Sequence, residues 1–87
     1  MKISNITGKN GQAVKNQFVV ENEGIIYFQS YESIIAKKHK GQITLDAHTW
    51  DYSMTTGKYR NIFLGEDKKT TEKKIKDGIY KLDNLNE

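Results

Sequence analysis

The 87-residue chain contains no cysteine, only one arginine and no long apolar run. Without cysteine, neither a disulfide nor a thiolate metal site can form. Because thirteen of the fourteen basic residues are lysines, bidentate recognition of phosphate or guanine by arginine is nearly absent. No segment approaches the roughly 20 apolar residues of a membrane span, and the N-terminus does not resemble a signal peptide. We therefore expect an intracellular, cytoplasmic protein.

The length predicts a single domain over residues 1–87. The hydrophobic fraction of 36% and the aromatic fraction of 10% are enough for a packed core and argue against wholesale disorder. The net charge of +3 arises in the segment up to Leu64, which has eight basic and five acidic residues, against six of each afterwards. So small an excess is a weak indication of nucleic-acid binding.

Short segments rich in β-branched and aromatic residues alternate with turn residues in the first half of the chain. They predict strands at Lys2–Ile6, Val14–Glu21, Ile25–Gln29, Ser33–Lys38 and Gln42–Asp46. The second and third strands are expected to pair antiparallel, because Glu21–Gly24 between them tolerates positive φ. Ser33–Lys38 is also compatible with a helical turn, since its few apolar residues do not fix a period, but a strand is favoured.

The pattern becomes helical at Ser53 or Thr55, both of residue types that cap helix N-termini. Tyr59, Ile62 and Phe63 recur at i, i+3 and i+4, the spacing of one helix face. A glycine follows at the position where a left-handed residue ends a helix. This stretch predicts a helix over about residues 55–64.

A second helix is predicted over Lys68–Asp77, capped by Asp67 and followed by a glycine. It is nearly all polar, with Ile75 as its one strong apolar anchor, so it should touch the domain along a narrow line. Ile79–Leu85 then alternates and predicts a last strand, placed beside Lys2–Ile6. The predicted fold is α+β, an antiparallel sheet of four to five short strands followed by two C-terminal helices.

The core is expected around the aromatic segment Trp50–Leu64, because aromatic side chains bury the largest areas per residue. The residues expected in or near it are Phe18, Val20, Ile26, Phe28, Ile35, Leu45, Trp50, Tyr59, Ile62 and Phe63.

Asp46, His48 and Asp51 form the arrangement nearest to a catalytic or metal site. In an extended segment, however, Asp46 and His48 would point to one face and Asp51 to the other. A zinc or magnesium site needs further ligands, and no second pair at ligand spacing occurs in the chain. The favoured interpretation is that the two aspartates end a strand and cap a turn. We expect no enzymatic activity, no metal and no cofactor.

Basic and aromatic residues provide the candidate binding site. The residues selected are Lys37, Lys38, Lys40, Tyr31, Tyr52, Lys58, Tyr59 and Arg60. A nucleic-acid-binding protein would align the cations on one face, with aromatic side chains for base stacking. A protein-binding module would instead expose aromatic anchors, for which Tyr27, Tyr31 and Tyr52 are candidates. Both alternatives stay open at this point.

The segment Trp50–Leu64 reads Trp-Asp-Tyr-Ser-x-Thr-Thr-x-Lys-Tyr and ends in Phe-Leu. Together with Phe28–Tyr31, Lys73–Gly78 and Asn84–Asn86, it resembles a domain of unknown function in small proteins of bacteriophages and related mobile elements. The resemblance spans nearly the whole chain, but the family brings no activity and no site residue. It implies a phage or prophage origin and a low-GC bacterial host.

In that context the expected function is stoichiometric binding to a bacterial host protein, which could itself be an effector that handles nucleic acid. An inhibitor of a defence system, similar to anti-CRISPR proteins, is the first example to test. The alternative is a small basic nucleic-acid-binding module.

Overall fold

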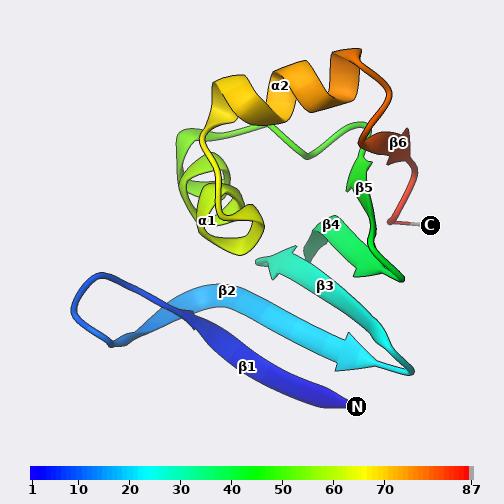
Figure 1. Cartoon of the computed structure of the whole chain (residues 1–87). Helices are drawn as coiled ribbons and strands as arrows, with labels where there is room; N and C mark the ends of the chain where they lie inside the picture. The colour runs from blue at the N-terminus through cyan, green and yellow to red at the C-terminus, as the bar shows by residue number, and fades with distance from the viewer. Residues whose placement is uncertain (87) are drawn as a thin grey trace.

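The predicted sheet and helices form in the predicted order in the computed structural model, which describes residues 1–86 (Figure 1). The α+β fold is therefore confirmed. Its elements are β1 Lys2–Thr7, β2 Ala13–Asn22, β3 Ile25–Ser30, β4 Ser33–His39, β5 Gln42–Asp46, α1 Met54–Leu64, α2 Lys68–Lys76 and β6 Lys81–Asp83. All belong to one six-stranded sheet or to the two helices, and the strands lie in the order β1-β2-β3-β4-β5-β6.

The partner predicted for the last strand was wrong. β6 pairs in parallel with β5, with Leu82 opposite Leu45, while β1 forms the far edge of the sheet. The reason is the route of the chain. A segment that leaves β5, passes through two helices and returns beside the same strand makes a crossover, and a crossover connects parallel strands. The backbone N–H of Ala47 bonds to the carbonyl of Asp83 at 2.9 Å and fixes this junction.

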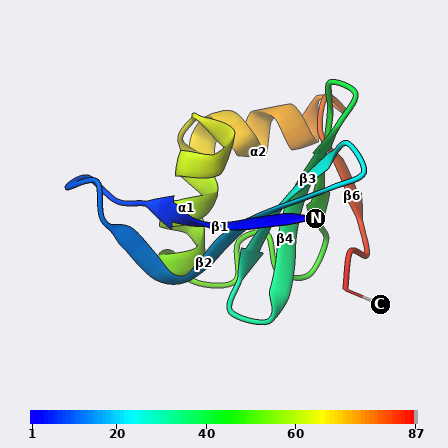
Figure 2. The same cartoon turned by 90° about the horizontal axis from the view of Figure 1, so that it is seen from below.

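Both helices lie on the same side of the curved sheet, and the opposite face has no helix over it (Figures 1 and 2). The strand register brings Val19, Phe28, Ala36 and Leu45 into one row across β2 to β5. Side chains of directly paired residues point to the same face, so this row is the inner face of the sheet. The ring of Phe63 from α1 stacks on Phe28 at a centroid distance of 5.7 Å. The core therefore lies between the sheet and α1.

Four of the expected core residues lie elsewhere. Phe18 and Val20 of β2 alternate with Val19 and so point to the uncovered face, where they line a shallow hollow of about 210 Å³. Ile62 is 47% exposed, because α1 turns Thr56, Tyr59 and Phe63 toward the sheet. Ile26 is half-buried and lies outside the core cluster. The sequence also missed buried Ile6, Ala36 and Tyr80.

The ends of the helices follow the predicted signals. The hydroxyl oxygen of Ser53 accepts a hydrogen bond from the N–H of Thr56 at 3.1 Å and caps α1. Gly65, with φ of 72°, ends that helix in the left-handed conformation. At the end of α2, the N–H of Ile79 bonds to the carbonyl of Lys74 and that of Gly78 to the carbonyl of Ile75. This pair of bonds is a Schellman motif.

A buried carboxylate attaches α2 to the rest of the domain. Glu66 accepts hydrogen bonds from Lys74 Nζ at 2.8 Å, from the Tyr80 hydroxyl at 2.7 Å and from the Thr71 hydroxyl at 2.6 Å. Burial alone would raise the pKa of Glu66, but these three bonds outweigh it and hold the pKa below its usual value. Glu66 therefore stays ionised in the folded protein at neutral pH.

We expect Glu66→Gln to lower the free energy of unfolding at neutral pH by about 1–3 kcal/mol, because an amide accepts weaker hydrogen bonds than a carboxylate. The pKa of Glu66 is lower in the folded than in the unfolded chain. Its contribution is thus present above the pKa of the unfolded chain and is lost as the pH falls through the pKa of the folded protein.

Urea denaturation of both proteins at neutral pH and at about pH 3 measures the effect. The difference in stability between wild type and variant should shrink in acid. Glu72→Gln, on an exposed position of α2, is the matched control and should show no such difference. A difference that stays constant with pH would contradict the role of the ionised carboxylate.

Candidate functional site

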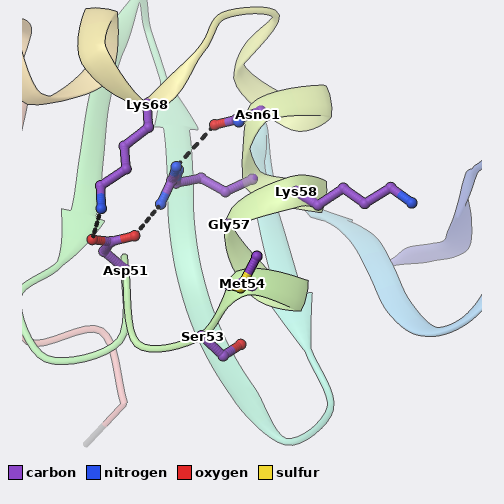
Figure 3. A pocket seen from close by; sticks show the side chains of 8 residues that line it. Asp51, Ser53, Met54, Gly57, Lys58, Asn61 and Lys68 are labelled. Carbon is purple, nitrogen blue, oxygen red and sulfur yellow. Dashed lines mark hydrogen bonds and ion pairs between the residues drawn. The ribbon is translucent and has the colours of Figure 1, made fainter.

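An open groove of about 540 Å³ runs along α1 (Figure 3). We call it the α1 groove. Its lining residues come from one stripe of the helix, from the turn before it and from the first residue of α2: Asp51, Ser53, Met54, Gly57, Lys58, Arg60, Asn61 and Lys68. Three cationic side chains and one carboxylate lie in this lining.

Arg60, the only arginine, is buried in the wall of the groove with 1% of its surface exposed. Its Nη1 donates to the carbonyl of Trp50 at 2.7 Å and to the carboxylate of Asp51 at 3.3 Å, while Nη2 donates to Asn61 Oδ1 at 2.9 Å. The guanidinium also lies 5.2 Å from the centre of the Trp50 ring, within cation–π range. The Nε–H is buried and has no acceptor within the described residues.

Asp51 connects the two helices through its carboxylate. One oxygen pairs with Arg60 and the other with Lys68 Nζ at 2.8 Å (Figure 3). Burial would raise the pKa of Asp51, but Lys68 and then Arg60 outweigh burial and keep the pKa below its usual value. The same pairing raises the pKa of Lys68. The one acceptor group of the groove is therefore ionised and already occupied by two cations.

The remaining polar groups of the groove are donors. Arg60 has no acceptor atom, so the Asn61 atom facing it must be the oxygen, and the amide nitrogen of Asn61 is left to donate. The Ser53 oxygen accepts from Thr56, which leaves the hydroxyl hydrogen of Ser53 available. Lys58 is exposed, makes no ion pair within residues 1–86, and points away from Asp51 and Lys68 in Figure 3.

Gly57 faces the guanidinium of Arg60 from the middle of α1. A glycine inside a helix costs about 0.5–1 kcal/mol relative to alanine. Packing does not require it here, because a Cβ at this position would lie 3.6 Å from both Nη atoms, an ordinary contact distance. The missing side chain instead leaves space in the groove beside the guanidinium.

Exposed apolar side chains stand at the N-terminal end of the groove. Met54, in its lining, is 94% exposed, and Tyr52, just before it, is 52% exposed. Tyr31, in the turn between β3 and β4, is also exposed. That turn is held near α1 by the hydrogen bond between the hydroxyls of Ser30 and Thr56 at 3.1 Å. We call Tyr31, Tyr52 and Met54 the rim.

The structure brings together four of the eight predicted binding residues. Lys58 and Arg60 line the α1 groove, and Tyr31 and Tyr52 belong to the rim. Arg60 was expected as a surface contact, but it is buried and holds the wall of the groove together. Tyr59 packs against the core cluster.

The other three predicted residues are scattered. Lys38 is a structural residue, because its Nζ donates to the carbonyl of Phe63 at 2.6 Å and lies 4.2 Å from the centre of that ring. Lys37 alternates with Lys38 and so points to the uncovered face of the sheet. Lys40 is exposed in the turn between β4 and β5. The five basic residues of the nucleic-acid hypothesis therefore do not share one face.

Sequence reasoning missed several lining residues. Ser53, Gly57 and Asn61 recur at i, i+4 and i+8, so their shared helix face was readable from the sequence. The position of Lys68 could not be read from the sequence, because its contact with Asp51 depends on how the two helices are oriented relative to each other.

The alternative site around Asp46 is structural. Its carboxylate accepts from the N–H of His48 at 3.1 Å, and from the N–H and the hydroxyl of Thr49 and the N–H of Leu85, each at 2.8 Å. Burial would raise the pKa of Asp46, but the bonds from Leu85 and then Thr49 hold it below its usual value. The prediction that Asp46 ends a strand and caps a turn is confirmed. Across residues 1–86, no three metal-ligating side chains come together.

These features define a small α+β domain with a polar groove on α1, the helix that follows β5. The chain belongs to a family of unknown function, DUF8033, whose family model matches residues 1–78. The matched residues include the whole α1 groove and end before Tyr80 and β6. No curated protein and no solved structure matches the chain. Neither helix within residues 1–86 has the length and apolar character to cross a membrane.

Proposed function

We propose that this protein is a non-enzymatic binding protein that associates stoichiometrically with a bacterial host protein through the α1 groove and its rim. The observation that carries the proposal is the exposure of Met54 and Tyr52 beside a groove lined with hydrogen-bond donors. Large side chains of this kind are frequent anchors of protein interfaces, where a partner removes them from water. We further propose that the protein is a phage-type accessory protein, works in the host cytoplasm and inhibits a defence effector.

Nucleic-acid binding is the second candidate, and the structure favours it less. A nucleic-acid surface gains affinity from several cations that neutralise neighbouring phosphates. Here Arg60 is buried, Lys38 is bonded to a backbone carbonyl, and Lys37 lies on the opposite face of the sheet. Dispersed cations of this kind support a protein partner instead.

Affinity capture from a low-GC bacterial lysate, with nuclease treatment before elution, tests the proposal. The variants are Tyr52→Ser and Met54→Ser on the rim, with Ile3→Ser as the matched control. Ile3 is an exposed aliphatic residue on the uncovered face of the sheet.

We expect one stoichiometric host protein to survive nuclease treatment and to be lost in both rim variants but not in the control. Loss with Ile3→Ser alone would move the interface to the uncovered face of the sheet and contradict the site. Recovery of nucleic acid with no protein would reject the protein-binding function.

A further inference from the structure

We infer that the α1 groove is a carboxylate-binding site that receives an acidic side chain of the protein partner, an inference that rests on the proposed function. The groove would thus add a polar, specific contact to the apolar contacts of the rim. Four features of the lining carry it: the charge balance, the occupied acceptor, the free donors and the glycine.

The charge balance favours an anion. Arg60 and Lys68 line the groove together with Lys58, whose side chain points away from Asp51 and Lys68, and Asp51 is the one acidic residue of the lining. Asp51 is engaged by both Arg60 and Lys68, so an incoming cation would find no free carboxylate. An incoming carboxylate would meet a site with excess positive charge, and part of that charge is held in the low-dielectric wall, where it acts more strongly than in water.

Free hydrogen-bond donors can orient such a group. Within residues 1–86 the amide nitrogen of Asn61 and the hydroxyl hydrogen of Ser53 are unused, because the oxygens of these side chains accept from Arg60 and Thr56. The Nε–H of Arg60 has no acceptor within residues 1–86 either, but it is buried in the wall of the groove. A group bound in the open groove does not reach this atom, so the donors that can orient it are those of Asn61 and Ser53. A carboxylate accepts several hydrogen bonds at once.

Gly57 keeps the space beside the guanidinium open. Alanine would fit against Arg60 and would favour the helix, yet the position carries the smallest residue. The space that Gly57 leaves is therefore available to a group bound beside the guanidinium.

We favour a carboxylate over a phosphate as the bound group. The excess positive charge of the lining attracts either anion, so the choice between them rests on the proposed partner. The protein partner proposed above presents carboxylates on ordinary Asp and Glu side chains, so it needs no modification to fill the site.

The single arginine makes a direct test possible, because the protein gives only one arginine Nε–H signal in ¹H–¹⁵N NMR spectra. The full-length protein is titrated with sodium acetate, a tetraglutamate peptide and inorganic phosphate, each against sodium chloride at equal ionic strength. We expect acetate and the peptide to shift the Arg60 Nε–H signal and the Gly57 and Asn61 amide signals saturably, the peptide at lower concentration. Phosphate should bind more weakly and chloride should have no effect.

Asn61→Asp is the decisive variant. It keeps the oxygen that accepts from Arg60, so folding is preserved, but it replaces the free amide donor by a negative charge. We expect peptide binding to fall at least about tenfold, the loss expected when a hydrogen bond to a charged group is replaced by repulsion. Asn10→Asp makes the same chemical change in the exposed turn between β1 and β2 and should leave binding unchanged.

Gly57→Ala separates binding from folding. The variant should raise the midpoint of thermal unfolding, because alanine favours the helix, and weaken peptide binding, because its methyl group occupies the groove. If both variants bind as wild type does, or if no carboxylate shifts the Arg60 signal, the inference is wrong. Tighter binding of phosphate than of tetraglutamate would also overturn it and would reassign the groove to phosphate groups.

These results are independent of the capture experiment. A captured host protein without a carboxylate response would leave the proposed function standing and remove only the acidic contact. A carboxylate response without any captured host protein would leave an anion site and remove the proposed partner.

Discussion

Phe28→Ala is expected to lower the free energy of unfolding by about 3–5 kcal/mol, the usual cost of removing a buried phenylalanine ring. Phe28 has no exposed surface; it lies beside Ala36 in the sheet, and its ring stacks on Phe63 from α1. Alanine would leave a cavity at the place where the sheet meets the helix. Packing around Phe63 should loosen as the free energy of unfolding falls. Because α1 carries both Phe63 and the groove, the substitution should also affect the groove.

Phe18→Ala is the matched control for this prediction. It makes the same chemical change on the adjacent strand β2, but its ring lies on the uncovered face of the sheet. Its cost should be clearly smaller, since a partly exposed ring leaves no closed cavity. Urea denaturation of the two variants, with slopes compared to wild type, measures the difference. Equal costs would mean that the two faces of the sheet are buried alike, contrary to the structure.

Arg60→Ala is expected to lower the free energy of unfolding by about 2–4 kcal/mol, because it removes buried hydrogen bonds and leaves their acceptors without a donor. The carbonyl of Trp50 and the amide oxygen of Asn61 lose their partner, and the Trp50 ring loses the guanidinium beside it. Asp51 is affected less, since Lys68 still pairs with it. The loss of unfolding free energy should therefore be smaller than the loss expected when a buried charge is left unpaired.

Two further substitutions define the role of Arg60. Lysine should not rescue it, because an ammonium cannot reproduce the planar fork that reaches three acceptors. Lys58→Ala, on the exposed side of the same helix, removes the same charge and should change stability by no more than about 0.5 kcal/mol. An Arg60→Ala protein as stable as Lys58→Ala would show that the guanidinium is not a buried structural group.

The sequence was sufficient to predict the secondary-structure elements, because their ends carry local chemical signals. Ser53, Gly65 and Asp67 mark helix boundaries through their own backbone and side-chain bonds, and the structure uses all three. The partner of β6 carried no such signal. Which strand receives it depends on where two helices return the chain, and that is a property of the tertiary structure.

Which face of each strand or helix is buried was predicted less well than where the element begins and ends. Phe18 and Val20 are as apolar as Val19, and alternation alone does not say which set the helices cover. In α1, Ile62 was favoured by its hydrophobicity, yet buried Thr56 and Arg60 take the inner positions because each finds hydrogen-bond partners there. The sequence does not show these hydrogen-bond partners, so Arg60 was predicted as a surface contact although it is buried.

The strand order also determines how the chain can reach this structure. From β1 to β5 each strand pairs with the next one along the chain, so these contacts close only short loops. Loop closure is entropically cheaper for short separations, and sheets built from local contacts fold faster than those with long crossovers. The parallel β5–β6 pair must close over both helices. We therefore expect the five-stranded meander to form first, while the C-terminal strand docks last, so a chain leaving the ribosome can pair most of its sheet before β6 has been synthesised.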